Sequence, residues 1–135
     1  MKTDKETWLV CGSRNSLNYR NEVSEVLNKL LKTKRELYGP DWKPECIIEG
    51  ECPCSADVYS RWWAEENGIA VKPFPATKGD YLHRNIKMLN EEPDEIIAFW
   101  DGFSYGTCFM IGRAVAKNLS VTIIPRGPLE IEPEG

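Results

Sequence analysis

Short apolar runs alternate with amphipathic stretches along this chain of 135 residues, and this alternation constrains the fold more than any other feature. The apolar runs have the length of strands, and several show no alternation with polar residues, which is typical of strands covered on both faces. They occupy residues 7–11, 46–48, 69–71, 96–100 and 121–124. The stretches between them have helical periodicity. The pattern therefore predicts an α/β fold with five strands and four helices.

The four helices are expected over about residues 20–38, from residue 55 or 56 to residue 66, from residue 81 onward, and after residue 107. The first has acidic residues early and basic residues late, as the helix dipole favours. Asn67 and Gly68 are a stop signal for the second. The apolar residues expected on the buried faces of the first three helices are Val23, Val26, Leu27, Leu30, Leu31 and Leu37, then Val58, Tyr59, Trp62 and Trp63, then Leu82, Ile86 and Leu89. Because Trp62 and Trp63 are adjacent, only one of them can point fully inward.

Right-handed crossovers between parallel strands restrict the topology to a doubly wound sheet with helices on both faces. The expected strand order is 3-2-1-4-5. In such a sheet, ligands bind beyond the carboxyl ends of the strands, where the winding direction reverses. In this order the first and fourth strands are neighbours at that point. The segments that follow them are therefore expected to face each other across one crevice.

Both of those segments contain residues that suit an anionic ligand. The first, at residues 12–14, combines a glycine that allows close approach to the backbone with a hydroxyl and a guanidinium. The second, at residues 101–107, combines glycines and hydroxyls with a helix N-terminus, where free amides can hold phosphate. The alternative for each is an ordinary strand-to-loop connection, with Thr107 as the N-cap in the second. The candidate binding residues are Gly12, Ser13, Arg14, Asp101, Gly102, Ser104, Gly106 and Thr107.

Two further segments contain candidate binding residues for an anionic ligand. Gly50, Ser55 and Asp57 surround the start of the second helix, where orphan amides can hold an anion. Arg84 and Asn85 come early on the third helix, where the arginine is suited to a phosphate and the amide to a base or ribose. The alternative for these two residues is an exposed helix surface.

Charge and cysteine content exclude several classes of protein. Seventeen basic against 21 acidic residues give a net charge of −4, which disfavours binding to nucleic-acid phosphates. No run approaches the ~20 apolar residues that cross a bilayer, so no membrane contact is expected. No signal-peptide core is seen, so a cytoplasmic location and reduced thiols are expected. Cys52 and Cys54 lack a second pair of ligands, so neither a metal nor another cofactor is expected.

Several motifs occur together and in order along about residues 7–124. They are Gly12-Ser13-Arg14, Gly50-x-Cys52-Pro53-x-Ser55-Ala56-Asp57, Trp63-Ala64 with Gly68-Ile69, Phe74-Pro75-Ala76, Arg84-Asn85-x-x-Met88, Asp94 with Phe99-Trp100, and Gly102-x-Ser104-x-Gly106-Thr107. This set resembles the SLOG superfamily, named for the Smf/DprA and LOG proteins, and within it the small YspA-like branch of bacteria and phages. The resemblance implies one Rossmann-like domain that binds a nucleotide or nucleotide-derived molecule and forms a homodimer or higher oligomer. Residues 125–135 lie outside it as an acidic tail with proline and glycine.

The resemblance also implies a role in nucleotide signalling or host–phage conflict, but this chain departs from the family pattern in two places. Ser55 stands where the branch has glycine. The LOG enzymes, which cleave the N-glycosidic bond of nucleoside monophosphates, have a catalytic glutamate whose position here is Met110, although Arg84 matches their arginine. A thioether cannot transfer a proton.

These departures favour a binding protein, a sensor or a sequestering protein, over an enzyme. The alternative is a LOG-type phosphoribohydrolase-like N-glycosidase in which Asp57 or Asp101 replaces the glutamate and acts with Arg84. Single-stranded DNA binding, as on the DprA side of the superfamily, is a third hypothesis. The acidic charge and the lack of an interleaved basic and aromatic stripe oppose it.

Overall fold

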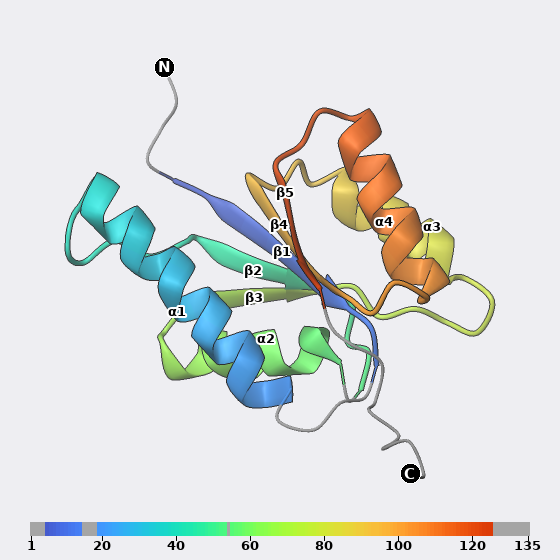
Figure 1. Cartoon of the computed structure of the whole chain (residues 1–135), viewed down its shortest axis with the longest axis horizontal. Helices are drawn as coiled ribbons and strands as arrows, with labels where there is room; N and C mark the ends of the chain where they lie inside the picture. Colours follow the sequence, from blue (N-terminus) through green and yellow to red (C-terminus); the bar gives the residue numbers. More distant parts are fainter. Residues whose placement is uncertain (1–4, 15–18, 54, 126–135) are drawn as a thin grey trace, which may run out of the picture.

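The centre of the protein is a sheet of five parallel strands in the order β3-β2-β1-β4-β5 (Figure 1). A computed structural model describes residues 5–14, 19–53 and 55–125. The strands are β1 (Thr7–Gly12), β2 (Cys46–Glu49), β3 (Ala70–Pro73), β4 (Glu95–Trp100) and β5 (Val121–Pro125). The strand order predicted from the sequence is therefore confirmed.

Four helices cover the two faces of this sheet. They are α1 (Tyr19–Tyr38), α2 (Ala56–Glu66), α3 (Tyr81–Leu89) and α4 (Tyr105–Ala116). Figure 1 shows α1 and α2 on one face and α3 and α4 on the other. This arrangement is the doubly wound, Rossmann-like α/β architecture. None of the helices in the described ranges has the length and apolar character needed to cross a bilayer.

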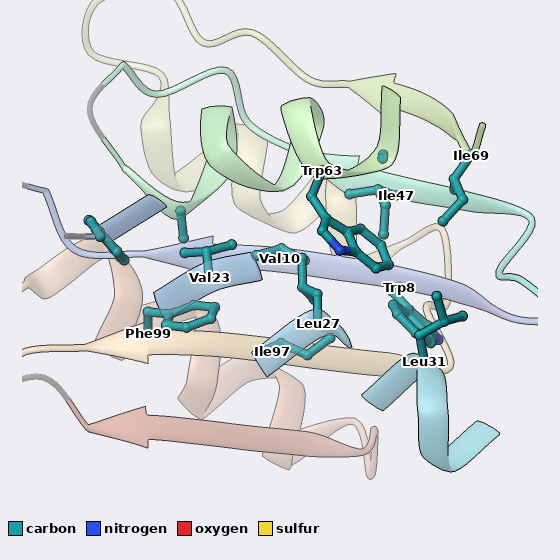
Figure 2. Close-up of a cluster of buried hydrophobic side chains, with 13 residues drawn as sticks. Trp8, Val10, Val23, Leu27, Leu31, Ile47, Trp63, Ile69, Ile97 and Phe99 are labelled. Atoms are coloured by element: carbon teal, nitrogen blue, oxygen red, sulfur yellow. The ribbon is translucent and has the colours of Figure 1, made fainter. Parts of the chain in front are cut away.

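Alternate residues of the central strands supply the two cores. Trp8 and Val10 of β1 pack under α1 and α2, whereas Leu9 packs under α3 and α4. Figure 2 shows the first of these clusters, in which the rings of Trp8 and Trp63 stack with centroids 6.1 Å apart. The side chains of the inner strands are almost entirely buried, as the unbroken apolar runs indicated. The edge strands β3 and β5 are much more exposed.

A buried carboxylate fastens α1 to the amino-terminal end of the sheet. Glu6 accepts hydrogen bonds from Trp8 Nε1 at 3.1 Å, Lys34 Nζ at 3.0 Å and Tyr38 Oη at 3.0 Å. Lys34 also donates to Glu95 at 2.9 Å. The charges of Glu6 and Lys34 are thus paired where water is excluded, which compensates for their desolvation. This network lies at the opposite end of the sheet from the strand-end loops.

The helix boundaries agree closely with the sequence, but several expected burials were wrong. Leu82 is 37% exposed and Ile86 only half-buried, because α3 turns Arg84 and Asn85 toward the sheet instead. Leu37, at the end of α1, is exposed. On α2, Val58 and Tyr59 are half-buried.

Two further expectations concern α2 and α4. Trp63 is buried and Trp62 is 38% exposed, so the expectation that only one tryptophan points inward is confirmed. The fourth helix begins at Tyr105, three residues before the expected start, and its N-cap is Ser104 in place of Thr107.

We expect Gly12→Ala to lower the free energy of unfolding by about 1–3 kcal/mol, the usual cost of overpacking. A Cβ on Gly12 would lie 2.3 Å from Tyr19 Oη and 2.9 Å from the backbone oxygen of Phe99. The matched control is Gly112→Ala in α4, where a Cβ meets nothing within 4 Å, and we expect it to stabilise by ~0.5–1 kcal/mol. Urea unfolding followed by circular dichroism measures both. Equal stability of Gly12→Ala and wild type would contradict the inference that Tyr19 and Phe99 leave no space for a Cβ at this position.

Candidate functional site

A cavity of about 570 Å³, hereafter the main cavity, lies where the carboxyl ends of β1 and β4 meet. These strands are neighbours in the sheet, and the winding direction reverses between them. The two segments predicted to converge, residues 12–14 and 101–107, both contribute to its walls. Their convergence on one crevice, which the sequence predicted, is therefore present in the structure.

Most of the candidate residues line the main cavity. Those that do are Gly12, Arg14, Asp57, Arg84, Asn85, Asp101, Ser104, Gly106 and Thr107. Four others do not line it, namely Ser13, Gly50, Ser55 and Gly102; the first three have supporting positions, whereas Gly102 is exposed and serves the turn with a φ of 86°. The Ser13 backbone N–H donates to Phe99 O at 2.8 Å, and its hydroxyl accepts from the Asp101 N–H at 3.1 Å. Ser55 is the N-cap of α2 and accepts from the Asp57 N–H at 3.1 Å.

Arg84 is buried and holds two loops together. Its Nη1 donates to the backbone oxygens of Gly50, at 2.5 Å, and Phe74, at 3.0 Å, while its Nε donates to Asn85 Oδ1 at 3.0 Å. A Cβ on Gly50 would lie only 2.3 Å from Nη1, so this position requires glycine. The alternative that Arg84 and Asn85 form an exposed helix surface is therefore wrong. The loops after β2 and β3 are fastened to α3 through this one guanidinium.

Asp57 is a buried carboxyl in the wall of the main cavity. It lies in the first turn of α2, and its Oδ2 accepts a hydrogen bond from the Cys52 N–H at 3.3 Å. Burial raises its pKa to about 6, although the nearby Arg84 charge and several hydrogen bonds partly offset that effect. Near neutral pH this group therefore exists in both protonation states.

Asp101, in contrast to Asp57, is stabilised in its ionised form. Its Oδ1 accepts from the backbone N–H groups of Phe103 and Ser104, both at 2.8 Å. Partial burial raises its pKa, but the hydrogen bonds from Ser104 and Phe103 outweigh that effect and leave the pKa below its ordinary value. Two loop amides that the sequence offered to a phosphate are thus occupied by this carboxylate.

The amides that remain at this end belong to the first turn of α4. A helix leaves its first N–H groups without partners inside the helix. The N-cap Ser104 makes no side-chain capping bond, and its hydroxyl donates instead to Thr107 Oγ1 at 3.3 Å. Ser104, Tyr105, Gly106 and Thr107 all line the main cavity, so the positive end of the helix dipole is directed into it.

Arg14 extends over the exposed edge of the cavity. Its Nε donates to Cys52 Sγ at 3.1 Å, and its backbone forms an antiparallel bridge with Ser55. The loops after β1 and β2 are therefore linked on one side of the cavity. Sulfur is a weak acceptor, so this guanidinium keeps most of its capacity to bind an anion.

Sequence reasoning missed the apolar part of the cavity. Tyr81 and Leu82 of α3 and Tyr105 of α4 line it and are exposed, while Met88 and Met110 line it and are buried. The helical spacing of residues 81, 84, 85 and 88 indicated a shared face, but the competing apolar face with Leu82, Ile86 and Leu89 was preferred. Met110, which the sequence resemblance had aligned with the catalytic glutamate of the LOG enzymes, contributes a thioether to the lining of the cavity.

The described cysteines Cys11, Cys46, Cys52 and Cys108 are free thiols. Cys54 lies outside the described residues. Within residues 5–14, 19–53 and 55–125, no three His, Cys, Asp or Glu side chains are grouped as metal ligands would be.

Comparisons with known proteins do not identify a family for the chain. No protein-family model, no curated protein and no solved structure matches it.

Glu49, at the end of β2, is a second buried carboxyl near Asp57. Its Oε2 accepts from the Glu51 N–H at 2.5 Å, which holds Glu51 at a left-handed φ of 56°. Its Oε1 has no hydrogen-bond partner among the described residues. Burial raises the pKa of Glu49 to about 7, and the negative charge of Asp57 adds to this effect.

We expect the stability of the protein to fall as the pH rises from about 4 to about 7. As the pH rises through this range the unfolded chain loses these protons first, because the folded protein holds them on Glu49 and Asp57 up to pKa values of about 7 and about 6. Each group contributes a slope of up to about 1.4 kcal/mol per pH unit between its two pKa values. Glu49→Gln should remove one contribution and flatten the slope, as measured by urea unfolding at several pH values. Glu25→Gln, which removes an exposed carboxylate of α1, is the matched control; an unchanged slope in Glu49→Gln would contradict the expectation.

Proposed function

We propose that this protein binds a nucleotide or nucleotide-derived small molecule in the main cavity and acts as a sensor or a sequestering protein. The observation that carries the proposal is the cavity itself. It lies at the winding reversal of a doubly wound sheet and joins anion-binding groups to exposed aromatic rings. Its volume of about 570 Å³ is within the range of small-molecule sites, ~300–1,000 Å³.

Arg14 and the first turn of α4 are suited to the phosphate. Each charge-assisted hydrogen bond contributes on the order of 1.5–3 kcal/mol, and micromolar affinity needs about 8 kcal/mol. One guanidinium and several helix amides supply enough such bonds. Arg84 adds positive charge to the lining of the cavity, although its own hydrogen bonds to Gly50 and Phe74 make it chiefly a positioning residue for the loops.

Tyr81 and Tyr105 are suited to a base. Both are exposed and line the main cavity, with Leu82 and Met88 as apolar neighbours. Stacking of a base on an aromatic ring contributes roughly 1–3 kcal/mol. Asn85, which the sequence offered to a base or ribose, has its amide between Arg84 and the Gly106 carbonyl, to which its Nδ2 donates at 3.4 Å. Ribose hydroxyls are therefore better matched to Asp57, whose carboxyl lines the cavity.

Isothermal titration with a panel of mono-, di- and cyclic nucleotides tests the proposal. We expect micromolar binding of at least one, and Arg14→Ala should weaken it about 10- to 100-fold, because a charge-assisted bond to phosphate is lost. The matched control is Arg113→Ala, which removes an exposed arginine of α4 that does not line the cavity and should leave the affinity unchanged. Binding no tighter than millimolar for every nucleotide, with folded and ligand-free protein, would contradict the proposal.

One observation favours an enzyme as the second candidate, namely a phosphoribohydrolase-like N-glycosidase. Cleavage of an N-glycosidic bond needs a proton donor near the leaving base, with a pKa close to the working pH. Asp57 lines the main cavity and has its pKa raised to about 6 by burial. Asp101 is the weaker choice, because backbone N–H groups hold it ionised. Because the thioether of Met110 cannot donate a proton, Asp57 is the group in the cavity best suited to this role.

Chromatographic detection of free base, after incubation with nucleoside monophosphates, separates the two candidates. If the protein is an enzyme, Asp57→Asn should lower turnover by at least 100-fold, on the order of a lost general acid, and Asp101→Asn should retain most of it. Calorimetry on both variants checks that the ligand still binds. Bound nucleotide without base release in the wild-type protein would rule out the enzyme and leave the binding protein.

A further inference from the structure

A smaller cavity of about 250 Å³ adjoins the main cavity. The two share the residues Arg14, Cys52, Tyr81 and Arg84, hereafter the shared wall. The smaller cavity is completed by the loop after β2, with Gly50 and Glu51, and the loop after β3, with Ala76. Its volume is below the ~300–1,000 Å³ of sites that hold a whole ligand. It is therefore better understood as an extension of the main cavity than as a separate site.

The shared wall contains both guanidinium groups of the site. The Cζ atom of Arg84 lies 6.0 Å from the centroid of the Tyr81 ring, and Arg14 Nε contacts Cys52 Sγ at 3.1 Å. Arg84 is fixed by its hydrogen bonds to two loop carbonyls. Arg14 is exposed and bonded to a weak sulfur acceptor, so it can exchange that contact for a phosphate oxygen. The strongest positive charge thus lies between the two cavities and not at one end.

This placement constrains the ligand. An anionic group at the shared wall leaves space on both of its sides, so a phosphate there is best matched when it carries an organic group in each direction. Among the described residues that line the smaller cavity, Glu51 alone has a carboxylate, and its Oε1 lies 3.6 Å from Arg61 Nη1. A carboxylate accepts hydrogen bonds from hydroxyl groups and repels a further phosphate. A small, neutral, hydroxyl-bearing group therefore suits this cavity better than a second anion does.

We propose that the ligand is a nucleoside diphosphate whose terminal phosphate is esterified to a further small group such as a sugar. The nucleoside occupies the main cavity, the phosphates lie between the first turn of α4 and the guanidinium groups of the shared wall, and the sugar lies in the smaller cavity. This inference rests on the proposed nucleotide-binding function and extends it, because a simple nucleotide would leave the smaller cavity without a ligand group.

Calorimetry with matched pairs of commercial ligands tests the inference. The pairs are ADP with ADP-glucose, GDP with GDP-mannose, and UDP with UDP-glucose, and each pair differs only in the sugar. In the pair whose base fits, we expect the sugar-linked form to bind at least about tenfold more tightly, although it carries less charge. Ala76→Phe, which fills the smaller cavity, should abolish this difference and leave the affinity for the free diphosphate unchanged. Thr77→Phe adds the same bulk at the next, exposed position, which lines neither cavity, and should keep the difference.

The outcomes separate this inference from the function on which it rests. Equal or weaker binding of every sugar-linked form, with clear binding of a free diphosphate, would overturn the inference and leave nucleotide binding intact. A preference for the sugar-linked form that persists in Ala76→Phe would also overturn it, because the sugar would then lie outside the smaller cavity. Absence of binding by all six ligands would overturn this inference, whereas the proposed function would be overturned only if the mono- and cyclic nucleotides of the earlier panel also failed to bind.

Discussion

The parallel pairing of β1 with β4 is the constraint on which the rest of the structure depends. Leu9 lies opposite Ile96, and Gly12 lies opposite Phe99. In this register β1 and β4 end side by side. Ser13, directly after β1, links the two strand ends, because its N–H donates to Phe99 O and its hydroxyl accepts from the Asp101 N–H. The main cavity lies at this point, with Gly12 and Arg14 on the β1 side of its lining and Asp101 and the first turn of α4 on the β4 side. Burial of both strands on both faces maintains this register, since a slip would exchange the residues of the two cores.

A buried arginine determines how the other side of the site is built. Arg84 would be costly to bury alone, but it is hydrogen-bonded to carbonyls of two loops and lies near the carboxyl of Asp57. Gly50 allows the guanidinium to approach the backbone, because any Cβ there would overlap it. The same group thus connects loop geometry, the ionisation of Asp57 and the positive charge between the two cavities. Packing and electrostatics are coupled through this one residue.

Burial also separates the roles of the two aspartates, which the sequence left as equal alternatives. Asp101 is at the edge of a loop, where backbone N–H groups stabilise its negative charge. Asp57 is enclosed at the start of α2, where the loss of water favours its neutral form. Both residues are aspartate and both follow a strand, so no local pattern distinguishes them. The difference comes from the packing of α2 against the sheet, which buries Asp57, and from the N–H groups of Phe103 and Ser104, which donate to Asp101.

The sequence by itself determined the strands, the helices and the doubly wound class of the sheet. Apolar runs and helical periodicity are local rules that were sufficient for the elements, and right-handed crossovers restricted the topology, within which the expected order 3-2-1-4-5 placed the cavity at two particular strand ends. Only the tertiary structure decided which face of α3 points inward, because the face with Leu82 and the face with Arg84 have comparable spacing. It also decided that Asp101 occupies amides expected to be open, and that the guanidinium groups lie between two cavities. These features depend on contacts between segments that are distant in the chain, and hydrophobic periodicity carries no information about such contacts.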